Sequence, residues 1–194
     1  MSLIILFCCC TNSLFAQKGF GDCILKSLTN IDSTVGDTIY NAMKWQNCVL
    51  DKPLPEIEFT TVSKEDVALK KLRGKVIALN FWFTACAPCI AEIPALNKLV
   101  QDYAGKDVVF FGITYDSYST LTSKFFPNYK FDFQIVCDVE NITEAFSAGY
   151  PTTYIIDKEG IVRSVWNGGF TGKEAETAAY LKAKPVIDEL LSEP

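Results

Sequence analysis

The sequence contains no histidine, and this absence removes several kinds of chemistry at once. Histidine is the commonest general base, the commonest metal ligand and a frequent axial ligand of haem. Catalysis by Ser-His-Asp or Cys-His groups and zinc sites built on histidine are therefore excluded. The chain also lacks a run of basic residues: 18 Lys and Arg stand against 23 Asp and Glu, a formal net charge of -5. Because binding to phosphate backbones needs a basic surface, nucleic acid is not expected as a partner.

Cysteine, in contrast, is plentiful. The 194 residues are 49% hydrophobic and 21% charged, which is typical of one globular domain with a modest extension. The eight cysteines are Cys8, Cys9, Cys10, Cys23, Cys48, Cys86, Cys89 and Cys137. With no histidine available, we expect the chemistry of this chain to depend on sulfur.

The first sixteen residues are similar to a short export signal. Residues 1–16 carry no charged side chain, and the apolar stretch 3–10 is followed by polar residues and by the small Ala16. This stretch is well short of the roughly 20 residues that cross a bilayer. Acylation of Cys10, which would give a membrane-anchored lipoprotein, is the alternative to cleavage after Ala16. In both cases we expect the folded part in the periplasm or at the outer face of the cytoplasmic membrane of a bacterium, where disulfides persist.

Residues 17–50 are interpreted as an N-terminal extension, because Pro53-Leu54-Pro55 indicates a new unit that begins near residue 51. The extension contains Cys23 and Cys48. In an oxidising compartment a disulfide between them would stabilise the fold by about 3 kcal/mol through restriction of the unfolded chain. Two separately buried thiols are the alternative, and we favour the disulfide.

The pattern of residues 51–194 predicts an α/β domain. Strands are expected at residues 57–62, 75–83, 108–114, 133–137, 152–156 and 161–166. Helices are expected directly after Cys86 and at residues 117–126, 141–147 and 173–191. Pro94 falls inside one of these helices and is expected to bend it, and Pro185 is expected to kink or divide the last helix. Helices that alternate with continuous apolar strands, followed by a hairpin, predict a central mixed β-sheet flanked by helices.

Residues 80–94, NFWFTACAPCIAEIP, carry the clearest chemical pattern. A buried strand leads to Cys86, and a helix starts at once. Unpaired backbone N–H groups and the helix dipole stabilise a thiolate there, so we expect the pKa of Cys86 to lie below the free value of about 8.5. Cys89, one turn later, is expected to be more buried. Such a pair of cysteines can exchange disulfides with a substrate. One alternative is a structural zinc site, which would need two further ligands. The other alternative is an inert disulfide.

The sequence resembles the thioredoxin superfamily in several residues: Trp82 ahead of the Cys-x-Pro-Cys helix start, Pro94 after it, and Pro151-Thr152 at a later strand. The opening at residues 53–59, Asn80, and an extra helix and strand between Tyr115 and Cys137 are similar to its exported TlpA/ResA-like branch, with an AhpC/TSA-Redoxin-type domain. Ala85 departs from that branch, which mostly has a second Trp there. The resemblance implies a thioredoxin-like fold over residues 51–194 with a helix-strand insertion.

The resemblance also implies roles for individual residues. Cys86 would be the attacking thiolate and Cys89 the resolving thiol, while Glu92 would carry a proton or tune the cysteine pKa values. A charge that merely favours the helix dipole, worth about 0.3–1 kcal/mol, is the alternative for Glu92. The residues expected to contact a substrate are Trp82, as half core and half rim, Pro88, Tyr150 and Pro151, the last with a cis peptide bond. Phe81 and Phe83 are expected to pack in the core, and no metal or cofactor is implied.

The predicted function is therefore thiol-disulfide exchange. The partners would be cysteine-containing envelope proteins and a membrane or envelope thiol donor. Ala87-Pro88 supplies neither a positive charge nor a histidine to stabilise the reduced thiolate, which favours the reducing direction. A thiol peroxidase is one alternative, but it needs a Thr three residues before the cysteine, whereas Thr84 is two before Cys86. The other alternative is an assembly module that handles a metal or haem. The chain lacks the cysteine spacing and the histidine of copper-delivery proteins.

Overall fold

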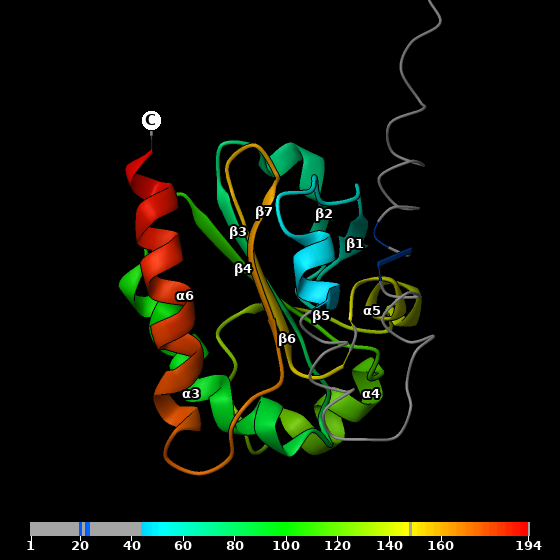
Figure 1. Ribbon diagram of the computed structural model, residues 1–194. Coiled ribbons are helices and arrows are strands. Elements are labelled where there is room, and N and C mark those ends of the chain that lie inside the picture. Colours follow the sequence, from blue (N-terminus) through cyan, green and yellow to red (C-terminus); the bar gives the residue numbers. More distant parts are fainter. Residues whose placement is uncertain (1–19, 21, 24–43, 148, 194) are drawn as a thin grey trace, which may run out of the picture.

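A computed structural model describes residues 20, 22–23, 44–147 and 149–193 of the chain (Figure 1). The predicted export signal, residues 1–16, and most of the predicted extension lie outside these residues. Among the described residues, no helix has both the length and the apolar character needed to cross a membrane.

A five-stranded mixed sheet in the order β5-β4-β3-β6-β7 forms the centre of the domain. Its strands are β3 (Val76–Phe81), β4 (Val108–Ile113), β5 (Gln134–Val136), β6 (Thr152–Ile156) and β7 (Val162–Asn167). β3, β4 and β5 run parallel, whereas β6 is antiparallel to both β3 and β7. Every residue of β3 and of β6 is buried. Because other elements cover both faces of these strands, apolar and polar residues do not alternate along them. The predicted mixed sheet is thus confirmed.

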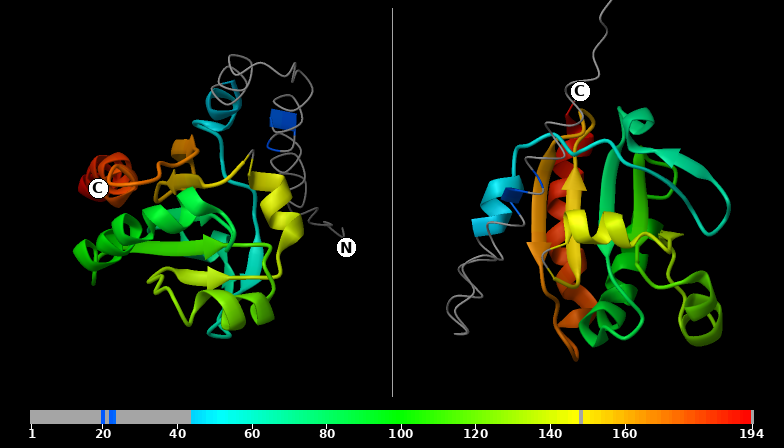
Figure 2. Two further views of the ribbon diagram at one scale, coloured as in Figure 1. Left: turned by 90° about the horizontal axis from the view of Figure 1, so that it is seen from below. Right: turned by 90° about the vertical axis from the view of Figure 1, so that its right-hand side faces the viewer.

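Helices cover the two faces of the sheet (Figure 2). α3 (Ala87–Asp102) and α6 (Ala175–Ser192) pack on one face, in a core cluster that also contains Cys86 and Cys89. α5 (Glu140–Phe146) and the helical residues 44–49 lie on the other face, in a second cluster with Phe20 and Cys23. The sheet therefore separates two apolar cores.

The predicted insertion follows β4. It consists of α4 (Tyr118–Thr120), the π-helical η2 (Leu121–Phe125) and β5, which pairs with β4 at the sheet edge. Leu121 and Phe125 are buried, so the apolar side of this segment covers one end of the first core.

A small hairpin precedes the main sheet. β1 (Glu58–Thr60) pairs with β2 (Asp66–Ala68), and the 3-10 helix η1 (Leu69–Leu72) follows. β1 is shorter than the strand predicted at residues 57–62, and β2 was not predicted. The Val62 N–H donates to the Ile135 carbonyl of β5 at 2.8 Å, which attaches the hairpin to the sheet edge.

Neither Pro94 nor Pro185 divides its helix, so the division considered for Pro185 is not found. Pro94 lies inside α3 and Pro185 inside α6, and both helices continue through the proline. Both prolines are exposed. On the solvent side, the carbonyl that loses its helical partner can bond to water, so each ring is accommodated without a break.

The predicted disulfide between Cys23 and Cys48 is present, with the two Cα atoms 5.7 Å apart. Cys23 is buried in the second core, beside Phe20 and Trp45. The Trp45 ring meets Tyr154 of β6 edge-on, with 5.9 Å between the ring centroids. The disulfide therefore joins two positions of the extension to each other, and the packing of Trp45 against Tyr154 attaches this part of the chain to the sheet.

Candidate active site

The site lies where β3 gives way to α3, and the chain reaches it through a tight turn. After β3 ends, the Trp82 N–H still pairs with the Ile113 carbonyl of β4 at 3.0 Å. The Cys86 N–H then donates to the Phe83 carbonyl at 3.1 Å, which closes a turn over Thr84 and Ala85. Cys86 is the N-cap of α3, so the predicted placement at a helix start is confirmed.

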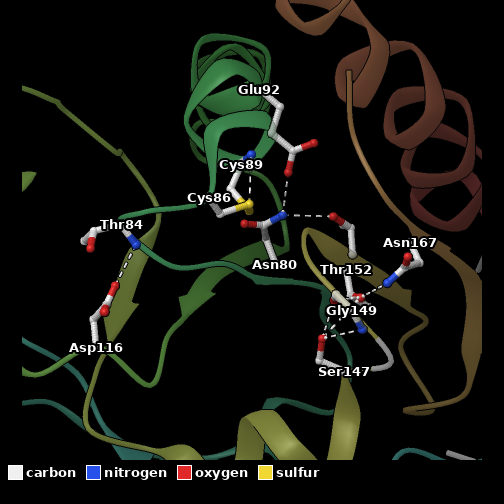
Figure 3. Close-up of a disulfide and its surroundings, with 11 residues drawn as sticks. Asn80, Thr84, Cys86, Cys89, Glu92, Asp116, Ser147, Gly149, Thr152 and Asn167 are labelled. Carbon is white, nitrogen blue, oxygen red and sulfur yellow. Dashed lines mark hydrogen bonds between the residues drawn. A yellow bond between two sulfur atoms is a disulfide. The ribbon is translucent and has the colours of Figure 1, made fainter. Parts of the chain in front are cut away.

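Cys86 and Cys89 form a disulfide, with Cα atoms 5.2 Å apart (Figure 3). The Cys89 N–H donates to Cys86 Sγ at 3.3 Å. Both residues are buried, at 5% and 2% exposure, Cys89 being slightly the more buried as predicted. An N–H of the first helical turn thus already points at the sulfur of Cys86. The same donor and the helix dipole would stabilise a thiolate at this position after reduction.

Glu92 is a buried carboxyl on the same face of α3 as Cys89. It is 3% exposed, and it projects toward Asn80 of β3, whose Nδ2 donates to Glu92 Oε1 at 2.9 Å (Figure 3). The same Nδ2 also donates to Thr153 Oγ1 of β6 at 3.0 Å, which fixes the amide. Burial raises the pKa of Glu92 from 4.5 to about 7, against the opposing effects of the Asn80 hydrogen bond and of Lys182. An exposed charge that merely favours the helix dipole, the alternative considered for Glu92, does not fit this environment.

The Tyr150–Pro151 peptide bond is cis, as predicted. Pro151 and Glu92 both lie against Gly169, in the loop after β7. A Cβ added at Gly169 would lie 3.0 Å from Pro151 Cγ and 3.4 Å from Glu92 Oε2. The structure therefore brings the cis-proline and the buried carboxyl of α3 together, although 59 residues separate them in the sequence.

The loop before Pro151 is held by its own side chains (Figure 3). Ser147 Oγ and Thr152 Oγ1 both donate to the Gly149 carbonyl, the second at 2.6 Å. Asn167 Nδ2 of β7 donates to Thr152 Oγ1 at 2.9 Å. The backbone that leads into Pro151 is thus fixed from β6 and β7.

Aromatic side chains form a cluster beside this loop, and sequence reasoning missed it. Phe83 lies 5.4 Å from Tyr115 and 5.1 Å from Tyr150 between ring centroids, and the two tyrosines are 5.8 Å apart. Tyr115 is 39% exposed, and Phe83 and Tyr150 are half-buried. Phe83, which was predicted to pack in the core, is partly buried and packs against the first core, and its ring also contacts this aromatic cluster. Because the three rings come from three separate segments, no spacing in the sequence indicates that they meet.

Trp82 differs from its prediction as half core and half rim. It is 1% exposed, and its ring lies 4.5 Å from Phe125 and 5.5 Å from Phe131 between centroids, on the side of the insertion. A ring covered in this way supports the site from within the core and cannot form its rim. Pro88, in contrast, is half-buried in the first turn of α3, where its missing N–H costs no helical bond.

Cys137, the remaining cysteine among the described residues, takes part in neither disulfide. Burial, helped by a contact of its Sγ with Asp138 Oδ2 at 3.3 Å, raises the pKa of this thiol to about 11. It is half-buried and lies directly after β5. In the described part of the chain, no three His, Cys, Asp or Glu side chains gather where they could hold a metal ion.

The sequence matches the AhpC/TSA family over residues 50–165. The chain belongs to this family. Among curated proteins, it is 37% identical to the thioredoxin-like protein YneN of Bacillus subtilis (strain 168) over 125 residues, which cover 63% of this chain and 74% of that protein. It is 30% identical to the thiol-disulfide oxidoreductase ResA of Bacillus thuringiensis (strain Al Hakam) over 156 residues, 78% of this chain and 89% of that protein.

Solved structures share the fold of this AhpC/TSA family member. A putative thiol:disulfide interchange protein DsbE from Chlorobium tepidum is similar with a TM-score of 0.59 and 23% identity, over 71% of this chain and 99% of that one. A putative protein disulfide isomerase from Bacteroides thetaiotaomicron has a TM-score of 0.60 and 21% identity, over 74% of this chain and 91% of that one. The predicted thioredoxin-like fold is thus confirmed.

Proposed function

We propose that this protein is an exported thiol-disulfide oxidoreductase that exchanges disulfides with other proteins of the bacterial cell envelope through Cys86 and Cys89. The observation that carries the proposal is the Cys86–Cys89 disulfide at the start of α3, with the Cys89 N–H on Cys86 Sγ. A sulfur in this position leaves as a thiolate easily and attacks as a thiolate readily. The printed names of the ResA relatives, thiol-disulfide oxidoreductases, support the same activity.

The exchange begins with the reduced pair. The Cys86 thiolate attacks one sulfur of a substrate disulfide, a mixed disulfide forms, and the other substrate sulfur leaves as a thiolate that takes a proton from water. The Cys89 thiol then loses its proton, and its thiolate attacks Cys86 Sγ. The Cys86–Cys89 disulfide forms and the second substrate sulfur is released. Two electrons have passed to the substrate, and a dithiol donor in the envelope restores the reduced pair.

Glu92 is the proton acceptor for Cys89 in this scheme. It stands three residues after Cys89, on the same face of α3. A carboxyl with a pKa of about 7 is half ionised at neutral pH, which suits a group that both takes and returns a proton. Asn80 holds one carboxyl oxygen and leaves the other directed toward Gly169.

The substrate polypeptide would bind along the segment before Pro151. The backbone of Tyr150 would pair with an extended stretch of the substrate, while Pro88 and Pro151 would contact it on either side of the disulfide. Two features support an oxidising location: the second disulfide, Cys23–Cys48, and the export-signal pattern of residues 1–16. The uncharged Ala87-Pro88 between the cysteines supports a reducing direction.

A trapping experiment tests the exchange. Cys89→Ser protein, incubated with an oxidised protein substrate, is expected to accumulate a mixed disulfide through Cys86, because the resolving thiol is gone. Non-reducing gels and mass spectrometry of the Cys86 peptide detect it. Cys86→Ser is the control and should form none, while Cys137→Ser should behave as the unmodified protein. Trapping that persists in Cys86→Ser, or none in Cys89→Ser, would contradict the proposal.

Equilibration of the pair against a glutathione buffer tests the direction. We expect a potential well below that of strongly oxidising proteins of this kind. A value near or above roughly -120 mV would overturn the reducing assignment while leaving the exchange itself intact.

A further inference from the structure

The turn that delivers Cys86 to the start of α3 depends on a side chain from a different element. The turn closes through the Cys86 N–H and the Phe83 carbonyl, and Thr84 and Ala85 lie between them. The Thr84 N–H is occupied by Asp116, whose Oδ2 accepts it at 2.6 Å (Figure 3). A short hydrogen bond to a carboxylate is stronger than one between neutral groups.

The backbone of Asp116 is held by hydrogen bonds at both its N–H and its carbonyl. Its N–H donates to Thr114 Oγ1 at 3.1 Å, and its carbonyl accepts the Asp138 N–H at 3.1 Å. Thr114 is fully buried, and its own N–H pairs with the Val136 carbonyl of β5 at 2.9 Å. The Asp116 carboxylate is therefore anchored to the ends of β4 and β5, and it transmits the position of these strands to the turn.

We propose that Asp116 is a positioning residue for Cys86: by holding the Thr84 N–H, it fixes the turn so that Cys86 Sγ stays aligned with the N–H groups at the start of α3. This inference rests on the proposed thiol-disulfide function, since it concerns the reactivity of the attacking sulfur. The stabilisation of a thiolate by helix N–H groups falls off within the first turn, so a small shift of the sulfur is enough to weaken it.

A direct effect of the Asp116 charge would act in the opposite sense. A negative charge near a thiol disfavours the thiolate, so loss of the charge alone would make Cys86 more reactive. Positioning predicts instead that loss of the geometry makes Cys86 less reactive, whatever happens to the charge. Two variants separate the effects: Asp116→Asn keeps an acceptor oxygen in place without the charge, and Asp116→Glu keeps the charge but displaces the oxygens by one methylene.

The experiment measures alkylation of Cys86 by iodoacetamide in the reduced full chain across a pH series, with mass spectrometry to locate the modified cysteine. We expect Asp116→Asn to react within about twofold of the unmodified protein. Asp116→Glu should react about tenfold more slowly at pH 7, the effect of a thiol pKa about one unit higher. Ser117→Ala is the matched control. Ser117 Oγ also accepts a backbone N–H, that of Thr120 at 3.1 Å, but it lies outside the Cys86 turn, and its loss should leave the rate unchanged.

Any pattern other than a slow Asp116→Glu with a near-normal Asp116→Asn overturns the proposal. A faster Asp116→Asn with a normal Asp116→Glu would assign the effect to charge. If Asp116→Glu does not fold, as judged by near-ultraviolet circular dichroism, Asp116→Ala takes its place: positioning predicts slower alkylation and charge predicts faster. Because alkylation needs no partner protein, failure here is distinguishable from failure of the trapping experiment with Cys89→Ser.

Discussion

The two carboxyl groups proposed to act on the Cys86–Cys89 pair, Glu92 and Asp116, have different surroundings. Glu92 is buried and bonded to one neutral amide, so burial dominates and its pKa rises to about 7. Asp116 is half-buried, and its side chain accepts the Thr84 N–H at 2.6 Å. The first is suited to move a proton, and the second to hold a segment of backbone in place.

The raised pKa of Glu92 predicts a pH dependence of folding. Between pH 4.5 and about 7 the unfolded chain has released a proton that the folded protein still holds. The contribution of this group to stability is therefore fully present below pH 4.5 and is lost as the pH rises toward 7. Above that pH the buried carboxylate costs about 3 kcal/mol, from 1.36 kcal/mol per pKa unit.

Glu92→Gln is accordingly expected to stabilise the protein at alkaline pH. The amide oxygen of Gln can still accept from Asn80, but it never ionises. Urea unfolding of the oxidised protein should show the variant more stable by up to about 3 kcal/mol at pH 8, and no more stable than the unmodified protein at pH 4. Glu189→Gln, an exposed change on α6, is the control. Equal stabilities at pH 8 would show that Glu92 ionises without cost.

The same substitution should slow the exchange reaction. Without a carboxylate, Cys89 loses the group proposed to take its proton. We expect release of a trapped substrate from Cys86 to be about a hundredfold slower at pH 7, at the low end of the range for general base catalysis. In the unmodified protein we expect this rate to rise between pH 6 and 8 as Glu92 ionises. The variant should not show this rise. Rapid-mixing measurements with a model protein disulfide test this, again beside Glu189→Gln. An unchanged pH profile would assign the proton transfer to water.

At the scale of the elements, the sequence predicts regular structure where several residues share one pattern. The apolar run of β3 and the helical spacing after Cys86 are local patterns, so the main strands and helices follow from them. β2 was missed because Asp66-Val67-Ala68 is too short to show a pattern. Its pairing with β1 is decided by burial of Phe59 against Phe111 of β4, with ring centroids 5.2 Å apart.

In the candidate site too, residues that lie close together in the sequence could be predicted, and residues that meet only through the fold could not. Cys86, Cys89 and Glu92 lie in one segment, so their proximity could be predicted from helix geometry. The cis bond before Pro151 was predicted through the resemblance to a family. Asp116 and Gly169 were missed, since each touches the site only through the fold: one from the end of β4, the other from the loop after β7. These contacts join residues far apart in the sequence, so no local pattern indicates them.

β4 offers a test of how closely the insertion packs. A Cβ at Gly112 would lie 3.0 Å from both Ile135 Cδ1 and Phe131 Cε1, and 3.1 Å from Trp82 Nε1. We expect Gly112→Ala to lower the free energy of unfolding by about 1–3 kcal/mol through overpacking. Urea titrations measure it.

Ile135→Val provides the matched second change for Gly112→Ala. It removes the Cδ1 atom that the new methyl group meets. Alone, it should cost about 0.5–1.5 kcal/mol. Combined with Gly112→Ala, it should cost less than the sum of the two single changes, since the clash is relieved. Strict additivity would indicate that the backbone of β4 moves and that the strand is not held rigidly beneath the insertion.

At the scale of the whole molecule, the two disulfides lie in different cores. Cys86 and Cys89 belong to the cluster with α3 and α6, whereas Cys23 belongs to the cluster behind the sheet. Asn80 and Thr153 connect the active-site carboxyl to β3 and β6 from the first side. In the sheet between the cores, β3 pairs with β4 over residues 76–81 and with β6 over residues 77–81. We therefore propose that the Cys86–Cys89 disulfide serves the chemistry and the Cys23–Cys48 disulfide the stability of the fold.

Replacing both Cys23 and Cys48 by Ala tests this division. The change frees a loop with a sequence separation of 25 and should lower the free energy of unfolding by about 3 kcal/mol. Under conditions where the protein stays folded, the rate at which dithiothreitol reduces the Cys86–Cys89 bond should remain within about twofold, because the contacts of Glu92 and Cys86 lie on the other side of β3. Cys137→Ala controls for loss of a cysteine as such. A tenfold change in that rate would instead show that the extension, through Trp45 and its contact with Tyr154 of β6, sets the geometry of the active site.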